Sequence, residues 1–489
     1  MIVDSKFSKS QALWFTIINY IGVLIGMIST LFIYPHDKDL LGILRFVDGF
    51  AQILYPVMVF GVSTALLNFQ PKLNVYLQRK LFSYSLLSIF IMILFCAIAV
   101  FMMYEWNWFK NKDYLIYGFL IAISLAYVDV FKRQATTLQK LAVPTFFEKI
   151  IPKLALPIIF LCVLHGYVSE IAGMWWYVIS FMLLMLGIIG FVFKHYTPVL
   201  SNDFSDLFSQ ISKKHYYQYS LYAFCASLGS FFAFRIDSIM IPELLSNQAN
   251  GDYSIGVNIA NALMIPATGV FALYSPILSK AIKNKDQEFI KEKYISVAKN
   301  LFFIGILLYG CIVIGLKDFF LLLPTAEQLL PTLTIIYILG ANVILNMATG
   351  FNTELIAFSS YYRFNLLTIV ILAFTNIILN YLVLTQTSLG IIGVAYTSLF
   401  SMLLFNLLKM WFIYYKMRIL PFDLPYIKTI ATSIVLLLII LMLPIDVYTN
   451  WAFVIKGIVY IVSLTTMAYV NQWIPELNLL ITKLTKKIR

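Results

Sequence analysis

Charged residues are scarce in this chain. Only 12% of its 489 residues are Asp, Glu, Lys or Arg, against roughly 25% in an ordinary soluble protein. Hydrophobic residues make up 61% of the sequence. This balance excludes an ordinary soluble protein and predicts a polytopic membrane protein.

Cysteine and histidine are also rare. The four cysteines lie in apolar runs with neither paired nor metal-like spacing: Cys96, Cys162, Cys225 and Cys311. We interpret them as packing residues. The sequence has no zinc, P-loop or dinucleotide motif, so we expect no metal and no cofactor. The connectors between apolar runs are too short for a catalytic domain, which argues against an enzyme such as a membrane-embedded polysaccharide polymerase or ligase.

The net charge of +12 is spread over short clusters between the apolar runs. A nucleic-acid partner would favour one concentrated basic patch, so none is expected. Membrane lipids are the expected acidic partner. The tail at 474–489 carries four basic residues, and we expect it to lie on anionic lipid.

Long apolar runs dominate the pattern. A helix needs about 20 apolar residues to cross roughly 30 Å of hydrocarbon. Runs of suitable length cover 12–34, 40–67, 82–104, 114–131, 145–164, 172–193, 216–242, 253–279, 300–323, 330–352, 364–384, 390–415, 426–444 and 451–473. We therefore expect an all-α protein of about 14 transmembrane helices. No small-residue cleavage site follows the first run, so we expect it to be retained.

Basic residues support this topology. With the N-terminus inside, most Lys and Arg residues, Lys409 among them, fall in cytoplasmic segments. A missed span would invert every later segment and destroy the bias. The prediction is a multi-pass protein of a bacterial cytoplasmic membrane with both termini cytoplasmic. Arg45 and Arg235 are then the only basic residues expected inside spans.

The order of prolines and connectors predicts two lobes. Pro35 and Pro56 in the first two spans correspond to Pro242 and Pro266 in the seventh and eighth. Because six spans separate the copies, both have the same orientation. The expected division is an N-lobe at 1–193, an amphipathic cytoplasmic linker at 194–215, a C-lobe at 216–418, two extra spans at 419–473, and the basic tail.

Several stretches resemble a known family. The opening SKSQALWFTIINYIGVLIGMISTLFIYP, the LLGILRF after it, and IPATGVFALYSPILSK in the eighth run are similar to the polysaccharide-biosynthesis flippases of the MOP superfamily, the Wzx-type oligosaccharide-lipid flippases. The resemblance implies transfer of an undecaprenyl-pyrophosphate-linked oligosaccharide from the cytoplasmic to the periplasmic leaflet by alternating access. It also implies other polysaccharide-assembly proteins as partners.

Two departures separate the chain from related branches. Lipid II flippases tend to carry arginines in the first span and near the position of Asn261, and here the first span has none. The drug antiporters of the superfamily usually have twelve spans and often an acidic residue in the first, which this chain lacks. An ion-coupled small-molecule or drug antiporter remains the alternative function.

The stretch FFAFRIDSIMIP, residues 231–242, contains the leading site candidates. Charged side chains at mid-bilayer cost about 2.5–3.5 kcal/mol on insertion scales, so Arg235 and Asp237 need a partner or a watery cavity. Being two apart, they point in different directions on a helix. A diphosphate head group would need fixed positive charge, and we expect Arg235 and Arg45 to supply it. Asp48 can pair with Arg45 at i,i+3, or Asp237 can be the counterion of Arg45.

Other candidates lie near the predicted cytoplasmic ends. Lys132, Arg133 and Arg363 are candidates for a mouth that captures pyrophosphate, although the positive-inside rule also explains them. Asp129 and Glu354 are candidates for ion coupling, and the alternative is a salt bridge to the neighbouring bases. In-span asparagines such as Asn261 either bind sugars or hold helices together.

Overall fold

The computed structural model describes residues 21–140, 142–199, 201, 203–443, 451–474 and 478. The regular secondary structure of these residues is helical, and no strand occurs in them. This confirms the all-α class. The predicted basic tail lies almost wholly outside the described residues, as does the start of the first span.

Helices follow one another with short connectors. Residues 21–32 are helical, and the later helices are α2 (Lys38–Val59), α3 (Val62–Phe69), α4 (Val75–Glu105), α5 (Leu115–Thr137), α6 (Ala142–Leu164), α7 (Glu170–Phe193), α8 (Ser205–Gln210), α9 (Lys213–Arg235), α10 (Asp237–Leu244), α11 (Asn247–Ala262), α12 (Ile265–Lys283), α13 (Gln287–Leu321), α14 (Ala326–Leu329), α15 (Leu333–Ala348), α16 (Asn352–Phe358), α17 (Arg363–Gln386), α18 (Gly390–Met417), α19 (Leu424–Leu441) and α20 (Ala452–Val470).

Most of these helices are long and apolar enough to cross a bilayer. By length and composition, 11 helices of the described chain pass, or 12 if the bent pair α9 and α10 forms one span. The two predicted spans not among them are 12–34, which is described only from residue 21, and 145–164, which falls on the charged helix α6. The chain is a multi-span membrane protein.

Three predicted spans are broken rather than straight. The 40–67 run divides at Phe60 and Gly61, which both adopt positive φ angles, of 48° and 73°. The 216–242 run bends by 46° between α9 and α10. The 253–279 run divides between α11 and α12, where Pro266 is the second residue of the new helix. Broken helices in transporters are tolerated where the freed backbone groups find protein or water.

The chain forms two compact units. The first contains residues 1–254 together with 377–391, and the second contains 255–376 together with 392–489. These units are defined by which residues contact one another, whereas the two lobes are predicted from a repeat in the sequence. The units therefore do not test the lobes. The lobes with their boundary at 194–215 therefore stay a prediction.

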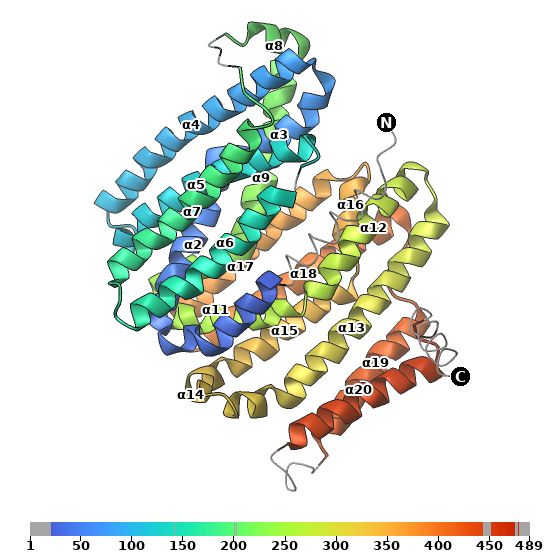
Figure 1. The fold of residues 1–489 in the computed structure, drawn as a ribbon. Coiled ribbons are helices and arrows are strands. Elements are labelled where there is room, and N and C mark those ends of the chain that lie inside the picture. Colours follow the sequence, from blue (N-terminus) through green and yellow to red (C-terminus); the bar gives the residue numbers. More distant parts are fainter. Residues whose placement is uncertain are drawn as a thin grey trace. The chain divides into compact units, whose positions relative to one another are not determined.

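Within the first unit, α2 packs along α5, and α5 in turn packs along α7 (Figure 1). Small residues allow this close packing: a Cβ on Gly118 of α5 would lie 2.8 Å from Phe50 of α2. Large apolar side chains such as Phe46 and Phe131 are fully buried here. The α2 helix is thus held between neighbours on several sides.

The N-terminal half of α2 also contacts α11 through backbone. The Asn250 side-chain amide donates to the Gly42 carbonyl at 2.8 Å, and Lys38 pairs with Asp252 at 2.6 Å. A Cβ on Gly42 would lie only 1.8 Å from the Asn247 carbonyl oxygen. Only glycine permits this approach, so the contact between α2 and α11 depends on it.

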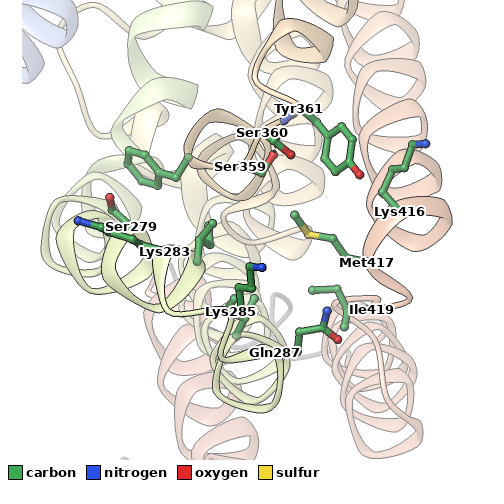
Figure 2. A pocket seen from close by; sticks show the side chains of 13 residues that line it. Ser279, Lys283, Lys285, Gln287, Ser359, Ser360, Tyr361, Lys416, Met417 and Ile419 are labelled. Carbon is green, nitrogen blue, oxygen red and sulfur yellow. Dashed lines mark hydrogen bonds between the residues drawn. The ribbon is translucent and has the colours of Figure 1, made fainter.

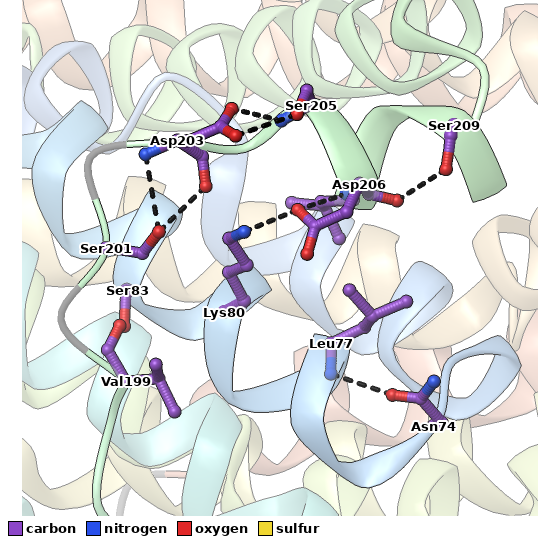
Figure 3. A network of polar contacts seen from close by, with 11 residues as sticks. Asn74, Leu77, Lys80, Ser83, Val199, Ser201, Asp203, Ser205, Asp206 and Ser209 are labelled. Atoms are coloured by element: carbon purple, nitrogen blue, oxygen red, sulfur yellow. Dashed lines mark hydrogen bonds and ion pairs between the residues drawn. The ribbon is translucent and has the colours of Figure 1, made fainter.

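The linker helix α8 is shorter than its apolar pattern suggests, with six residues. Its Leu207 is fully buried, and Asp206 forms an ion pair with Lys80 of α4 (Figure 3). The Lys80 ammonium holds the pKa of the Asp206 carboxyl below its usual range. The ring of Phe208 in α8 also lies 5.2 Å from the ring of Tyr84 in α4. The helix is therefore attached to α4 by both an aromatic and a charged contact.

The second unit is built around α13, which packs against α15, α19 and α20. Two buried tyrosines connect these helices: Tyr426 of α19 donates to the Ala298 and Ala348 carbonyls at 3.1 and 2.9 Å, and Tyr460 of α20 donates to the Ile306 carbonyl at 2.8 Å. The final two helices are thereby hydrogen-bonded to this unit.

Candidate functional site

Arg45 and Asp48 of α2 form one half of the site. Arg45 Nη1 lies 3.2 Å from Asp48 Oδ2, and Tyr177 of α7 donates to Asp48 Oδ1 at 2.7 Å. The Arg45 guanidinium also lies 5.9 Å from the centre of the Tyr34 ring. Arg45 Nε is buried and has no hydrogen-bond acceptor in the described part of the chain. The i,i+3 pair considered in the sequence is present, and Arg45 pairs with Asp48 rather than with Asp237.

We predict that this pair makes Arg45 important for stability. Arg45→Met leaves the largely buried Asp48 carboxylate without its cation and should lower the free energy of unfolding by roughly 1.5–3 kcal/mol, the range for hydrogen bonds to charged groups. Adding Asp48→Leu removes the orphaned charge and should restore most of the loss. Thermal unfolding of the purified single and double variants measures both. A double variant as unstable as the single one would show that the pair is not the cause.

Arg235 and Asp237 lie at the bend between α9 and α10. Arg235 is the last residue of α9, and Asp237 is the first of α10. The two helices meet at an angle of 46° within an otherwise apolar span, and discontinuous helices are the kind of position at which transporters place ligand contacts. The stretch singled out in the sequence therefore coincides with a structural break.

Asp237 is held by two neighbouring helices. Tyr253 of α11 donates to Asp237 Oδ2 at 2.9 Å, and Asn380 of α17 donates to Asp237 Oδ1 at 2.6 Å. Both donors are buried. These contacts provide a local reason for a carboxylate in an apolar region and fix the start of α10.

Arg235 differs from the other three charges of the site. Its side chain is exposed, and within the described ranges no carboxylate lies at ion-pair distance from it. It interacts electrostatically with Asp48, Asp237 and Arg45. Since both carboxylates already accept hydrogen bonds from other partners, Arg235 retains the capacity to bind an anion.

Close packing brings the two halves together. A Cβ on Gly49 would lie 2.9 Å from Ser238 Cβ and 3.7 Å from the Arg235 carbonyl oxygen. Gly49 follows Asp48 directly, so α2 contacts the bend of α9 and α10 at the level of the charged residues. The structure thus gathers Arg45, Asp48, Arg235 and Asp237 in one region of the first unit.

The candidate mouth residues of the first unit are already paired. Lys132 lies 2.5 Å from Glu148 of α6, and Arg133 Nε lies 3.4 Å from Asp129 Oδ1. Ser63 of α3 also donates to Asp129. Asp129 therefore forms the salt bridge to a neighbouring base that the sequence suggested. These contacts join α5 to α3 and α6.

The remaining candidates belong to the second unit. Asn261 is exposed in the last turn of α11, and Arg363 is exposed at the start of α17. Glu354 of α16 is half-buried. Burial raises the pKa of the Glu354 carboxyl, and the nearby Lys409 opposes this effect. Its electrostatic partner is thus Lys409.

Lys409 corrects the sequence interpretation. The topology prediction places it in a cytoplasmic segment, but it lies within α18 and is completely buried. Its ammonium donates to Thr353 Oγ1 at 2.8 Å and lies 3.7 Å from the centre of the Phe405 ring. Arg45 and Arg235 are therefore not the only basic residues inside helices of the membrane region. Because Lys409 lies close to the basic residues at the end of α18, the sequence alone groups it with them.

Two site residues were missed entirely. Tyr177 and Tyr253 orient the carboxylates of Asp48 and Asp237, but tyrosine is common in this sequence and neither has a distinctive neighbour. Asn380 is one of the in-span asparagines for which the sequence leaves sugar binding and helix packing open. No group of three or more metal-ligating side chains occurs among the residues that the structure describes. The arrangement is suited to binding an anion through Arg235.

Solved structures show the same fold. The chain matches a structure described as "Lipid II flippase MurJ, inward closed conformation" with a TM-score of 0.70 and 13% identity, covering 94% of this chain and 99% of that one. An inward-facing MATE family multidrug resistance transporter of the MOP superfamily matches with a TM-score of 0.61 and 12% identity, over 83% and 94%. A crystal structure of a MATE protein in the bent conformation gives a TM-score of 0.52 and 12% identity, over 83% and 95%.

No protein-family model matches the sequence. No curated protein sequence matches it either. The chain therefore has the fold of these solved structures, which are described as a lipid II flippase and as MATE family transporters.

Proposed function

We propose that this protein is a flippase that transfers a polyprenyl-pyrophosphate-linked oligosaccharide from the cytoplasmic to the outer leaflet by alternating access. The observation that supports the proposal is the exposed Arg235 at a helix bend, with no carboxylate of the described chain at ion-pair distance. A guanidinium binds phosphate through paired hydrogen bonds. The pyrophosphate is the part of such a substrate that remains the same when the sugars differ.

The charges at the site favour this function over the drug-antiporter alternative. An exporter of organic cations needs carboxylates that accept the cation or exchange it for an ion. Here Asp48 and Asp237 each accept a tyrosine hydroxyl, and Asp48 is also paired with Arg45. The positively charged group is the one that is exposed. An anionic substrate therefore fits the site better than a cationic one.

Proteoliposomes provide the test. The purified protein should move a fluorescent polyprenyl-pyrophosphate oligosaccharide between leaflets, as measured by the fraction that a membrane-impermeant quencher reaches. Lipid II in a parallel assay tests the nearest alternative substrate of the same chemical class. Sodium- or proton-driven uptake of small organic cations, without movement of either lipid, would overturn the proposal and establish the antiporter.

A further inference from the structure

A second cationic site lies in the second unit and shares no residue with the site around Arg235. A pocket of about 720 Å³ opens where the end of α12, the start of α13, the loop from α16 to α17 and the end of α18 meet (Figure 2). Three lysines line it, namely Lys283, Lys285 and Lys416, and none of its 13 lining residues is acidic. The pocket therefore presents positive charge without a carboxylate to neutralise it.

The nearest carboxylate along the chain is engaged elsewhere. Asp286, which follows Lys285, accepts a hydrogen bond from the Phe289 backbone N–H at 3.1 Å and caps α13. Lys285 itself adopts a left-handed conformation with φ of 57°, a conformation that is uncommon for lysine. The Asp286 carboxylate is therefore used to cap α13, and Lys285, not Asp286, lines the pocket.

Hydroxyl groups add uncharged donors to the lysines. The side chains of Ser279, Ser360 and Tyr361 line the pocket, and in the described part of the chain their hydroxyls have no hydrogen-bond partner. Ser359, by contrast, is used by the loop itself, since it donates to the Ile356 carbonyl at 2.9 Å. Ammonium and hydroxyl donors together are the groups that bind phosphate oxygens.

The size and the walls of the pocket indicate more than a bare ion. Its volume is within the range of roughly 300–1,000 Å³ typical of small-molecule sites. The remaining walls are largely apolar, from Ile282, Ile290, Phe358, Met417 and Ile419. An amphipathic ligand fits both kinds of wall: its phosphate is attracted by the lysines, and its organic part contacts the apolar side chains.

We propose that this pocket binds a phosphate ester on the side of the protein that the basic residues assign to the cytoplasm, with Lys283, Lys285 and Lys416 supplying the positive charge that attracts the phosphate. The phosphate belongs either to an anionic phospholipid head group or to a soluble phosphate compound. The site shares no residue with the proposed transport site, and its occupancy does not depend on which substrate is transported.

Binding to the intact protein tests this proposal. Native mass spectrometry of the full chain in detergent, titrated with phosphatidylglycerol, should show one preferentially retained lipid. The triple variant Lys283→Gln, Lys285→Gln, Lys416→Gln should bind it roughly 100-fold more weakly, since each lysine near an anionic lipid contributes about 1 kcal/mol. The matched variant Lys140→Gln, Lys291→Gln, Lys428→Gln removes the same charge from exposed positions outside the pocket and should bind like wild type.

A third variant separates the pocket from surface charge alone. Ser360→Trp keeps every lysine but fills part of the hollow, and it should also weaken binding. Displacement of the lipid by millimolar inorganic phosphate would identify a soluble phosphate compound as the ligand, and no displacement would identify the lipid. Equal losses in both triple variants, or no binding of either probe to wild type, would overturn the proposal.

Discussion

Arg235→Ala should reduce the initial rate of lipid-linked oligosaccharide transfer by roughly 10- to 100-fold, because a charge-assisted hydrogen bond to phosphate is worth about 1.5–3 kcal/mol. The abundance and the thermal stability of the variant should stay close to wild type. The reason is that Arg235 is exposed and takes part in no ion pair or hydrogen bond of the described structure. The proteoliposome assay measures the rate, and membrane quantification measures abundance.

Two further variants sharpen this experiment. Arg235→Lys keeps the charge but loses the planar fork of donors, so an intermediate rate would indicate paired hydrogen bonds to the pyrophosphate. Arg418→Ala removes an exposed arginine after α18 and should leave the rate unchanged. Failure of Arg235→Ala to accumulate would show instead that this arginine has a structural role. A normal rate would exclude it from the transport site.

Gly42→Ala should destabilise the protein more than the same change at Gly49, the other glycine of α2. The new Cβ would lie 1.8 Å from the Asn247 carbonyl oxygen, which is backbone and cannot rotate away. The two helices must separate, at a cost of about 1–3 kcal/mol or more. Separation also weakens the Asn250 hydrogen bond to Gly42 and the Lys38 ion pair with Asp252. We expect a lower unfolding midpoint of the purified variant.

Gly190 provides the control for this change. It lies in α7, and a Cβ there meets nothing within 4 Å. Gly190→Ala should be neutral or slightly stabilising, since alanine is the better helix former by about 1 kcal/mol. Equal midpoints for the two variants would contradict the proposed role of the backbone contact. A lower midpoint for Gly42→Ala alone would confirm it.

The sequence predicted the overall class because bilayer insertion depends on local properties. Hydropathy over about 20 residues reports whether a segment partitions into lipid, without reference to any other segment. For the same reason the 231–242 stretch was identifiable: two charges in an apolar run are costly wherever the run folds. The i,i+3 relation of Arg45 and Asp48 was also readable, because both residues lie on one helix.

Breaks within the membrane helices were harder to predict from the sequence. A break in the eighth run lies at the start of α12, where Pro266 stands in the first turn. The division at Phe60 is different, because Phe60 adopts a positive φ that its residue type does not favour. Packing of the surrounding helices, including the contact between Gly61 and Ser220, selects that conformation. The break between α2 and α3 could therefore not be located from the sequence alone.

By itself, the sequence determined that this is a helical membrane protein with two rare charges in its seventh apolar run. Only the tertiary structure decided which charges have partners. Tyr253 of α11 and Asn380 of α17 donate hydrogen bonds to Asp237, and Arg235 is left exposed at the bend. Lys409 shows the same limit, since its burial depends on Thr353 and Phe405 around it. The cost of a charge in the membrane is a local property, but its compensation depends on helices that meet only after folding.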